Sequence, residues 1–123
     1  MCYKITSLFG IAHGHAAALC DRILFLWMID NTEKCIDPRG ERYLQKVLDG
    51  IGQAMGCKNG KDGAERLMEI VKKLELEIPT ATKEQIVELS TSVNTVRLRN
   101  HPVGLSDETI AILYHKILNG VQL

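Results

Sequence analysis

Apolar residues recur at helical spacing along most of this chain, and one stretch is apolar almost all round. From Ala16 to Ile29, only Asp21 and Arg22 are strongly polar. A helix without a polar face belongs in the middle of a bundle. We therefore predict that this segment is the most buried helix and that the other helices pack around it.

The next segment has one apolar face and predicts an amphipathic helix. Asp37 and Pro38 are suited to its N-cap and first position, and Gly56 to its end. Gly50 and Gly52 would each weaken this helix by about 1 kcal/mol relative to alanine, and a close helix crossing is one explanation for them. The apolar positions recur every three or four residues: Tyr43, Leu44, Val47, Leu48, Ile51 and Met55.

Three more helices are predicted in the second half of the chain. One follows the turn at 59–62 and ends before Pro79; the next opens with a capping box formed by Thr82 and Gln85. The last begins after Ser106 and ends at Gly120. Residues 93–104 have no sustained helical period and are expected to form a loop, with one short turn as an alternative, whereas residues 1–9 are rich in large apolar side chains. The pattern predicts one all-α domain over residues 1–123, a bundle of five to six helices.

Composition excludes several functional classes. Apolar residues make up 46% of the chain, and Lys plus Arg equal Asp plus Glu at 15 each. Without a basic stripe, nucleic-acid binding is not expected, and no apolar run is long enough to span a membrane. The N-terminus lacks the features of a secretory signal. We expect a cytoplasmic protein in which the cysteines are reduced thiols: Cys2, Cys20, Cys35 and Cys57.

The histidines are the main candidates for chemistry. His13 and His15 lie where the apolar helix begins, and unpaired backbone N–H groups and the helix dipole favour a ligand there. Being two residues apart, they point in different directions and cannot chelate one ion together. His101 is expected to be hydrated or bonded to backbone, and His115 to lie at the surface. The residues assemble no complete metal site, no hydrolytic triad and no phosphate-binding glycine loop.

Two stretches resemble the iron-containing (group III) alcohol dehydrogenases. Thr6–Leu19 contains Phe-Gly-Ile-Ala-His-Gly-His-Ala and is similar to the HG-x-A-x-A helix of that family, in the branch that includes phosphonoacetaldehyde reductases. Ser92–Val103 is similar to the V-N-x-x-R-L-x-N-N-P stretch of the same branch, with His101 in place of the second asparagine. The order of the motifs and the helical interval between them extend the resemblance over nearly the whole chain.

The resemblance implies a dehydroquinate synthase-like helical domain. The enzymes of this family transfer hydride between NAD(P)H and an aldehyde, and a divalent metal, typically iron, polarises the carbonyl. One aspartate and three histidines hold the metal, and His13 matches the last of these histidines. The preceding one would lie fourteen residues earlier, upstream of Met1. Tyr3 stands where many members have a further histidine. Met28 replaces an expected asparagine, and a proline usual near the middle of the helix is missing, so the substrate stays open.

We therefore expect the C-terminal metal-binding-type domain of such an oxidoreductase, without its nucleotide-binding domain. By itself it should hold no metal or NAD(P) tightly and have no turnover. His13 should then lie at the rim of an open face, while His15 packs structurally; alternatively, His13 is a satisfied core histidine at the Gly10 turn. The alternative function is a helical interaction module or a catalytically decayed remnant. In either case exposed apolar surface should favour a homo-oligomer.

Overall fold

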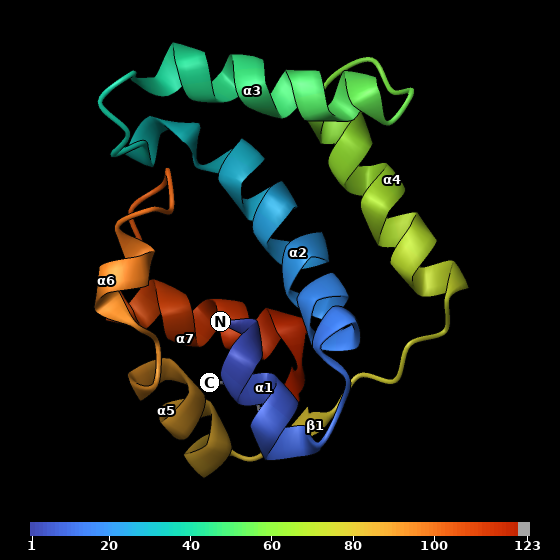
Figure 1. Ribbon diagram of the computed structural model, residues 1–123, viewed down its shortest axis with the longest axis vertical. Helices are drawn as coiled ribbons and strands as arrows, with labels where there is room; N and C mark the ends of the chain where they lie inside the picture. Colours follow the sequence, from blue (N-terminus) through green and yellow to red (C-terminus); the bar gives the residue numbers. More distant parts are fainter. Residues whose placement is uncertain (121–123) are drawn as a thin grey trace.

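The computed structural model describes residues 1–120, and it confirms an all-α fold (Figure 1). A 3₁₀ turn and a parallel pairing of two two-residue strands accompany the helices; the strand residues are Thr80 with Asn119 and Ala81 with Gly120. In chain order the elements are α1 (Cys2–Phe9), α2 (His13–Asp30), η1 (Thr32–Lys34), α3 (Glu41–Ala54), α4 (Gly60–Lys73), β1 (Thr80–Ala81), α5 (Lys83–Thr91), α6 (Thr95–Leu98), α7 (Asp107–Ile117) and β2 (Asn119–Gly120).

Helix α2 is the element that joins the two parts of the core. Its N-terminal half packs with α1, α4, α5 and α7 in one cluster, to which it contributes Ala16, Leu19 and Cys20. Its C-terminal half contributes Phe25 to a second cluster with residues of α3 and α4 and with Val103. Figure 1 shows α2 running diagonally between these two groups of helices. The central position predicted for this helix is confirmed.

The prediction that this helix is the most buried is wrong. Four of the 18 residues of α2 are buried, compared with four of the 11 residues of α7. Leu24 and Trp27 are only half-buried, although Phe25 is 7% exposed. Helix α3 diverges from α2 after η1 (Figure 1). One side of α2, including Leu24 and Met28, therefore lines a cavity and is not covered by another helix.

Three of the predicted helices begin at residues whose side chains cap them. Thr82 and Gln85 form the predicted capping box, with both reciprocal hydrogen bonds present. Ser106 accepts a hydrogen bond from the backbone N–H of Thr109 and opens α7. Asn59 does the same for α4. Each of these polar side chains satisfies a backbone N–H group that would otherwise lack a partner.

The predicted start of α3 is wrong. Asp37 does not cap a helix at Pro38, because its carboxylate accepts hydrogen bonds from the backbone N–H and the guanidinium of Arg39 at 2.9–3.0 Å. These bonds lower the pKa of Asp37 to about 2. The chain continues to Gly40, where φ is 89°, and α3 begins at Glu41 without a side-chain cap.

The predicted end of the last helix and the helix count also change. Helix α7 ends at Ile117 and not at Gly120, because Leu118 has an extended backbone and Asn119 pairs with Thr80. Seven α-helices occur in residues 1–120, one more than the upper prediction. The additional one is α6, the single short turn that was the alternative for the predicted loop at 93–104, and Asn94 caps it through its side chain.

Helix α3 crosses another helix closely at Gly52, one of its two glycines. A Cβ atom at Gly52 would overlap the carbonyl oxygen of Asn59, and one at Gly63 would lie 2.7 Å from the Cα of Gly52. Gly50 has open space around it, so the crossing does not explain that residue. The glycine pair lets the backbones of α3 and α4 touch where they meet (Figure 1).

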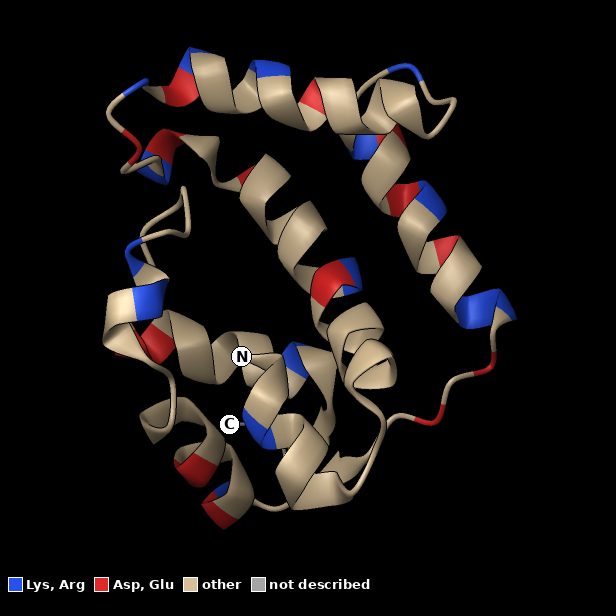
Figure 2. Ribbon diagram, in the orientation of Figure 1, with Lys and Arg blue, Asp and Glu red and all other residues tan. Residues whose placement is uncertain are grey.

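Charged residues lie mainly on the outer helices (Figure 2). Helix α2 carries charge only at Asp21, Arg22 and Asp30. Arg22 is used structurally: its guanidinium donates a hydrogen bond of 2.9 Å to the carbonyl oxygen of Ile117 at the end of α7. Within residues 1–120, no helix combines the length and the apolar character needed to cross a bilayer.

Candidate functional site

His13 begins α2 at an end that no side chain caps. Gly10 adopts a left-handed conformation with φ 65° and turns the chain out of α1, and Ala12 is the extended N-cap residue. The side chain of His13 is exposed, and its ring has no hydrogen bond to any of residues 1–120. The predicted position at an open helix start is therefore confirmed, and the alternative of a core histidine at the Gly10 turn is wrong.

His15 is held in place by the loop after α4. Its Nε2 atom lies 2.7 Å from the carbonyl oxygen of Glu77, to which it donates a hydrogen bond, and its side chain is half-buried. The expectation that His15 has a structural role is confirmed. One of the two histidines is thus free for a ligand, while the other fixes the loop that leads to β1.

Tyr3 connects His13 to a residue more than eighty positions away. The ring of Tyr3 lies 5.2 Å from that of His13, measured between centroids, and the guanidinium carbon of Arg97 lies 5.3 Å from the Tyr3 ring centre. Arg97 is positioned by α6, where the side chain of Asn94 accepts hydrogen bonds from the N–H groups of Val96 and Arg97. The two stretches that carry the family resemblance therefore meet at one aromatic ring.

A cavity of about 760 Å³ adjoins this contact. One wall is formed by apolar side chains of α2 and α3, and the facing wall by α1, α6 and the segment around them. Tyr3 and Arg97 belong to the lining. The apolar wall includes Leu24, Met28, Leu44, Val47, Leu48 and Ile51. The hollow is large enough for a small-molecule ligand.

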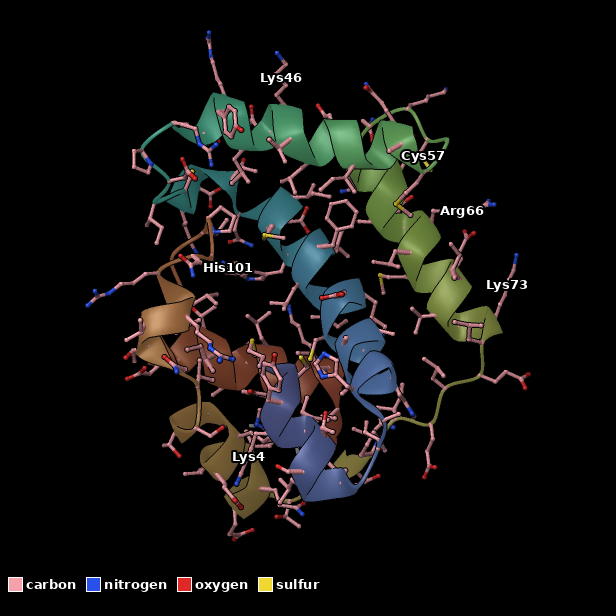
Figure 3. All side chains as sticks on the ribbon, viewed as in Figure 1. Lys4, Lys46, Cys57, Arg66, Lys73 and His101 are labelled. Carbon is pink, nitrogen blue, oxygen red and sulfur yellow. The ribbon has the colours of Figure 1, made fainter. Side chains whose placement is uncertain are left out.

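His101 lies in the loop after α6, beside α2 (Figure 3). The loop is fixed to the end of η1, since Ile36 donates to the carbonyl oxygen of Pro102 and Cys35 forms an antiparallel bridge with Val103. The Nδ1 atom of His101 donates to the carbonyl oxygen of Val103 at 2.8 Å. The predicted backbone hydrogen bond is confirmed. It fixes the orientation of the His101 ring, which also lines the cavity.

Three charged side chains border the cavity: Lys4, Asp21 and Arg97. Lys4 forms an ion pair with Glu88 at 3.1 Å. Neither Asp21 nor Arg97 has an oppositely charged partner within 4.0 Å among the described residues. Partial desolvation raises the pKa of Asp21.

Cys20 also lines the cavity but is not a nucleophile. It is 2% exposed, and burial, followed by the neighbouring Cys2, raises the pKa of its thiol to about 12. Because the thiolate is the reactive form, this thiol is inert at neutral pH. The prediction that Cys20 acts as a small apolar residue is confirmed.

The surface position predicted for His115 is wrong. Its side chain is half-buried, and its Nδ1 atom is enclosed without a hydrogen-bond partner among residues 1–120. Helix α7 packs against both α2 and α5, so even side chains beside its main buried face are partly covered.

The described residues do not fit a complete metal site. No three histidine, cysteine, aspartate or glutamate side chains within residues 1–120 come together in a way that could hold an ion. Zinc sites in proteins use three or four such ligands, and the exposed imidazole of His13 supplies one. An imidazole is a common ligand of iron and zinc. A single ligand does not make a metal site, so we derive no catalytic step from it.

Sequence reasoning identified His13 but missed its surroundings. In the sequence, Tyr3 stands out only as a position where the resembling family often has histidine, and Arg97 only as part of a motif. The signal that places Arg97 is Asn94, a good N-cap residue ahead of a short helix. The comparisons with protein-family models, with curated proteins and with solved structures found no match for the chain.

Proposed function

We propose that this chain is the metal-side helical domain of an NAD(P)-dependent, iron-containing alcohol dehydrogenase. In such an enzyme His13 would be one of the protein ligands of a divalent metal. The observation that carries the proposal is the meeting of two motifs at Tyr3, where His13 lies on one side at 5.2 Å and Arg97 on the other at 5.3 Å. Both motifs resemble the same branch of that family, and the second of them lines the cavity together with Tyr3.

The position of His13 supports this role. A histidine that shares a metal ion with ligands from another domain must be accessible to that domain. His13 is exposed at the start of a long helix. Its neighbour His15 is engaged with Glu77 and is not available. The remaining ligands and the nucleotide site must come from another domain, so we expect no turnover from this chain alone. The four cysteines are free thiols, which fits the proposed cytoplasmic location.

The DNA that precedes codon 1 provides the first test. We expect the reading frame to continue upstream into an α/β nucleotide-binding domain, with a histidine fourteen residues before His13. The protein encoded by that whole frame should oxidise NAD(P)H in the presence of an aldehyde, with phosphonoacetaldehyde among those assayed. His13→Ala should abolish this activity, and His15→Ala should reduce it less. A stop codon or an unrelated sequence upstream would contradict the proposal.

A second candidate function rests on the exposed face of α3. Three large side chains of its predicted apolar face are exposed: Tyr43 and Val47 by 40%, and Ile51 by 44%. An apolar strip of this kind favours self-association, as in a helical interaction module or a remnant without chemistry. Analytical ultracentrifugation separates the two proposals when combined with metal analysis. A stable homo-oligomer from a gene without the upstream domain would favour the interaction module.

A further inference from the structure

The cavity between α2, α3 and α6 has two unlike walls. On the α2–α3 side, Leu24, Met28, Val47 and Ile51 present apolar surface. Val47 and Ile51 are 40% and 44% exposed although they belong to the apolar face of their helix. Lys46 of the same helix points away from α2, toward solvent (Figure 3). An alkyl group in the cavity would remove this apolar surface from water, which is favourable.

The opposite wall carries a cation without a counter-ion. Lys4 is neutralised by Glu88 at 3.1 Å. The guanidinium of Arg97 is stacked over Tyr3 and has no carboxylate within 4.0 Å among residues 1–120. An arginine stacked on an aromatic ring keeps its N–H groups available to bind a carboxylate or another oxyanion with two hydrogen bonds.

We propose that this cavity binds an amphiphile with an acidic head group and a medium-length alkyl tail, with the head group at Arg97 and the tail along α2 and α3. An acidic head supplies the counter-ion that Arg97 lacks, whereas an alcohol would bury only the tail and a cationic head would be repelled. Asp21 is the remaining charged group in the lining. The side chain of Asp21 is exposed on α2, so solvent screens its repulsion of an acidic ligand.

Decanoate, kept below its micelle concentration, is a direct probe of the proposed site. Its binding to the 123-residue chain can be followed by calorimetry and by the fluorescence of Trp27. Trp27 is the single tryptophan, and its ring lies 6.5 Å from that of the cavity residue His101. We expect saturable binding of one decanoate per chain, about tenfold weaker binding of 1-decanol, and weaker binding still of decyltrimethylammonium.

The head-group contact is tested by Arg97→Gln with Arg99→Gln as its control. Both arginines are exposed and lie two residues apart, but only Arg97 lines the cavity. We expect Arg97→Gln to weaken decanoate binding about tenfold and to leave decanol binding unchanged, while Arg99→Gln changes neither. Equal effects of the two substitutions would overturn the assignment of the head group.

The tail contact is tested by Ile51→Gln with Ile70→Gln as its control. The two isoleucines are similarly exposed, at 44% and 41%, but Ile70 lies on α4 outside the cavity. Ile51→Gln should weaken binding of both decanoate and decanol, and Ile70→Gln should weaken neither. A lack of saturable binding, or a second copy of the chain that covers α3 and excludes decanoate, would overturn the proposal. Because these assays need no metal or nucleotide, their outcome is independent of the proposed dehydrogenase function.

Discussion

The two histidines at the start of α2 have different surroundings although only Gly14 separates them. His13 is exposed and contacts the ring of Tyr3, whereas His15 is half-buried and donates to the carbonyl oxygen of Glu77 at 2.7 Å. A spacing of two places the side chains on different sides of a helix. The sequence is therefore sufficient to predict that they differ, but not which contact each one makes.

Their effects on stability should differ accordingly. We expect His13→Ala to change the free energy of unfolding by less than about 0.5 kcal/mol. His15→Ala should lower it by about 1 kcal/mol, because it leaves a carbonyl group without its donor. Urea unfolding of the two variants measures both values. A larger loss for His13→Ala than for His15→Ala would contradict the ligand role proposed for His13.

Cys20 should make the fold sensitive to alkaline pH. Its pKa rises from an ordinary 9.0 to about 12 in the folded chain, so between these values the unfolded state loses a proton that the folded state keeps. The free energy of unfolding should then fall with rising pH, by about 1 kcal/mol per pH unit above pH 9 for this group.

Unfolding of the reduced protein at pH 8 to 10.5 tests this slope. Cys20→Ala should remove most of the decrease that we assign to the thiol, although the substitution also lowers stability at every pH by creating a cavity. Cys57→Ala, at a half-buried position near the end of α3, is the control and should leave the slope unchanged. An unchanged slope in Cys20→Ala would show that another group is responsible.

At the scale of elements, the helices that open with a polar cap could be predicted from the sequence. Thr82 and Ser106 form the caps expected of them. Asp37 does not cap the helix predicted to follow it, because its carboxylate accepts hydrogen bonds from Arg39 two residues later. Helix α6 has too few residues to show a period and could not be found from apolar spacing. Local capping chemistry is readable from sequence when no competing partner lies nearby.

The crossing of α3 and α4 gives a matched pair of glycine substitutions. A Cβ at position 52 would overlap the backbone of Asn59, so Gly52→Ala should cost about 3 kcal/mol. At position 50 nothing lies within 4 Å, so Gly50→Ala should stabilise the helix by about 1 kcal/mol. Thermal or urea unfolding of both variants measures the difference. A mild effect at both positions would contradict the close crossing of these helices.

At the scale of the whole molecule, the cavity could not be predicted from the sequence. The apolar face of α3 predicts burial of Val47 and Ile51, but α3 diverges from α2 and leaves both residues at the cavity wall. Likewise, His13, Tyr3 and Arg97 lie on three different helices, α2, α1 and α6. They come together only because these helices pack on the core that includes α7. Such contacts between distant segments follow from packing, and no local pattern encodes them.

The metal content of the protein encoded by the whole reading frame tests the central claim most directly. Elemental analysis should find about one divalent metal ion per chain in that protein and in its His15→Ala variant. His13→Ala should lose the metal, and the 123-residue chain by itself should hold no stoichiometric iron or zinc. Retention of the metal by His13→Ala, or a full complement of metal in the isolated chain, would contradict the account.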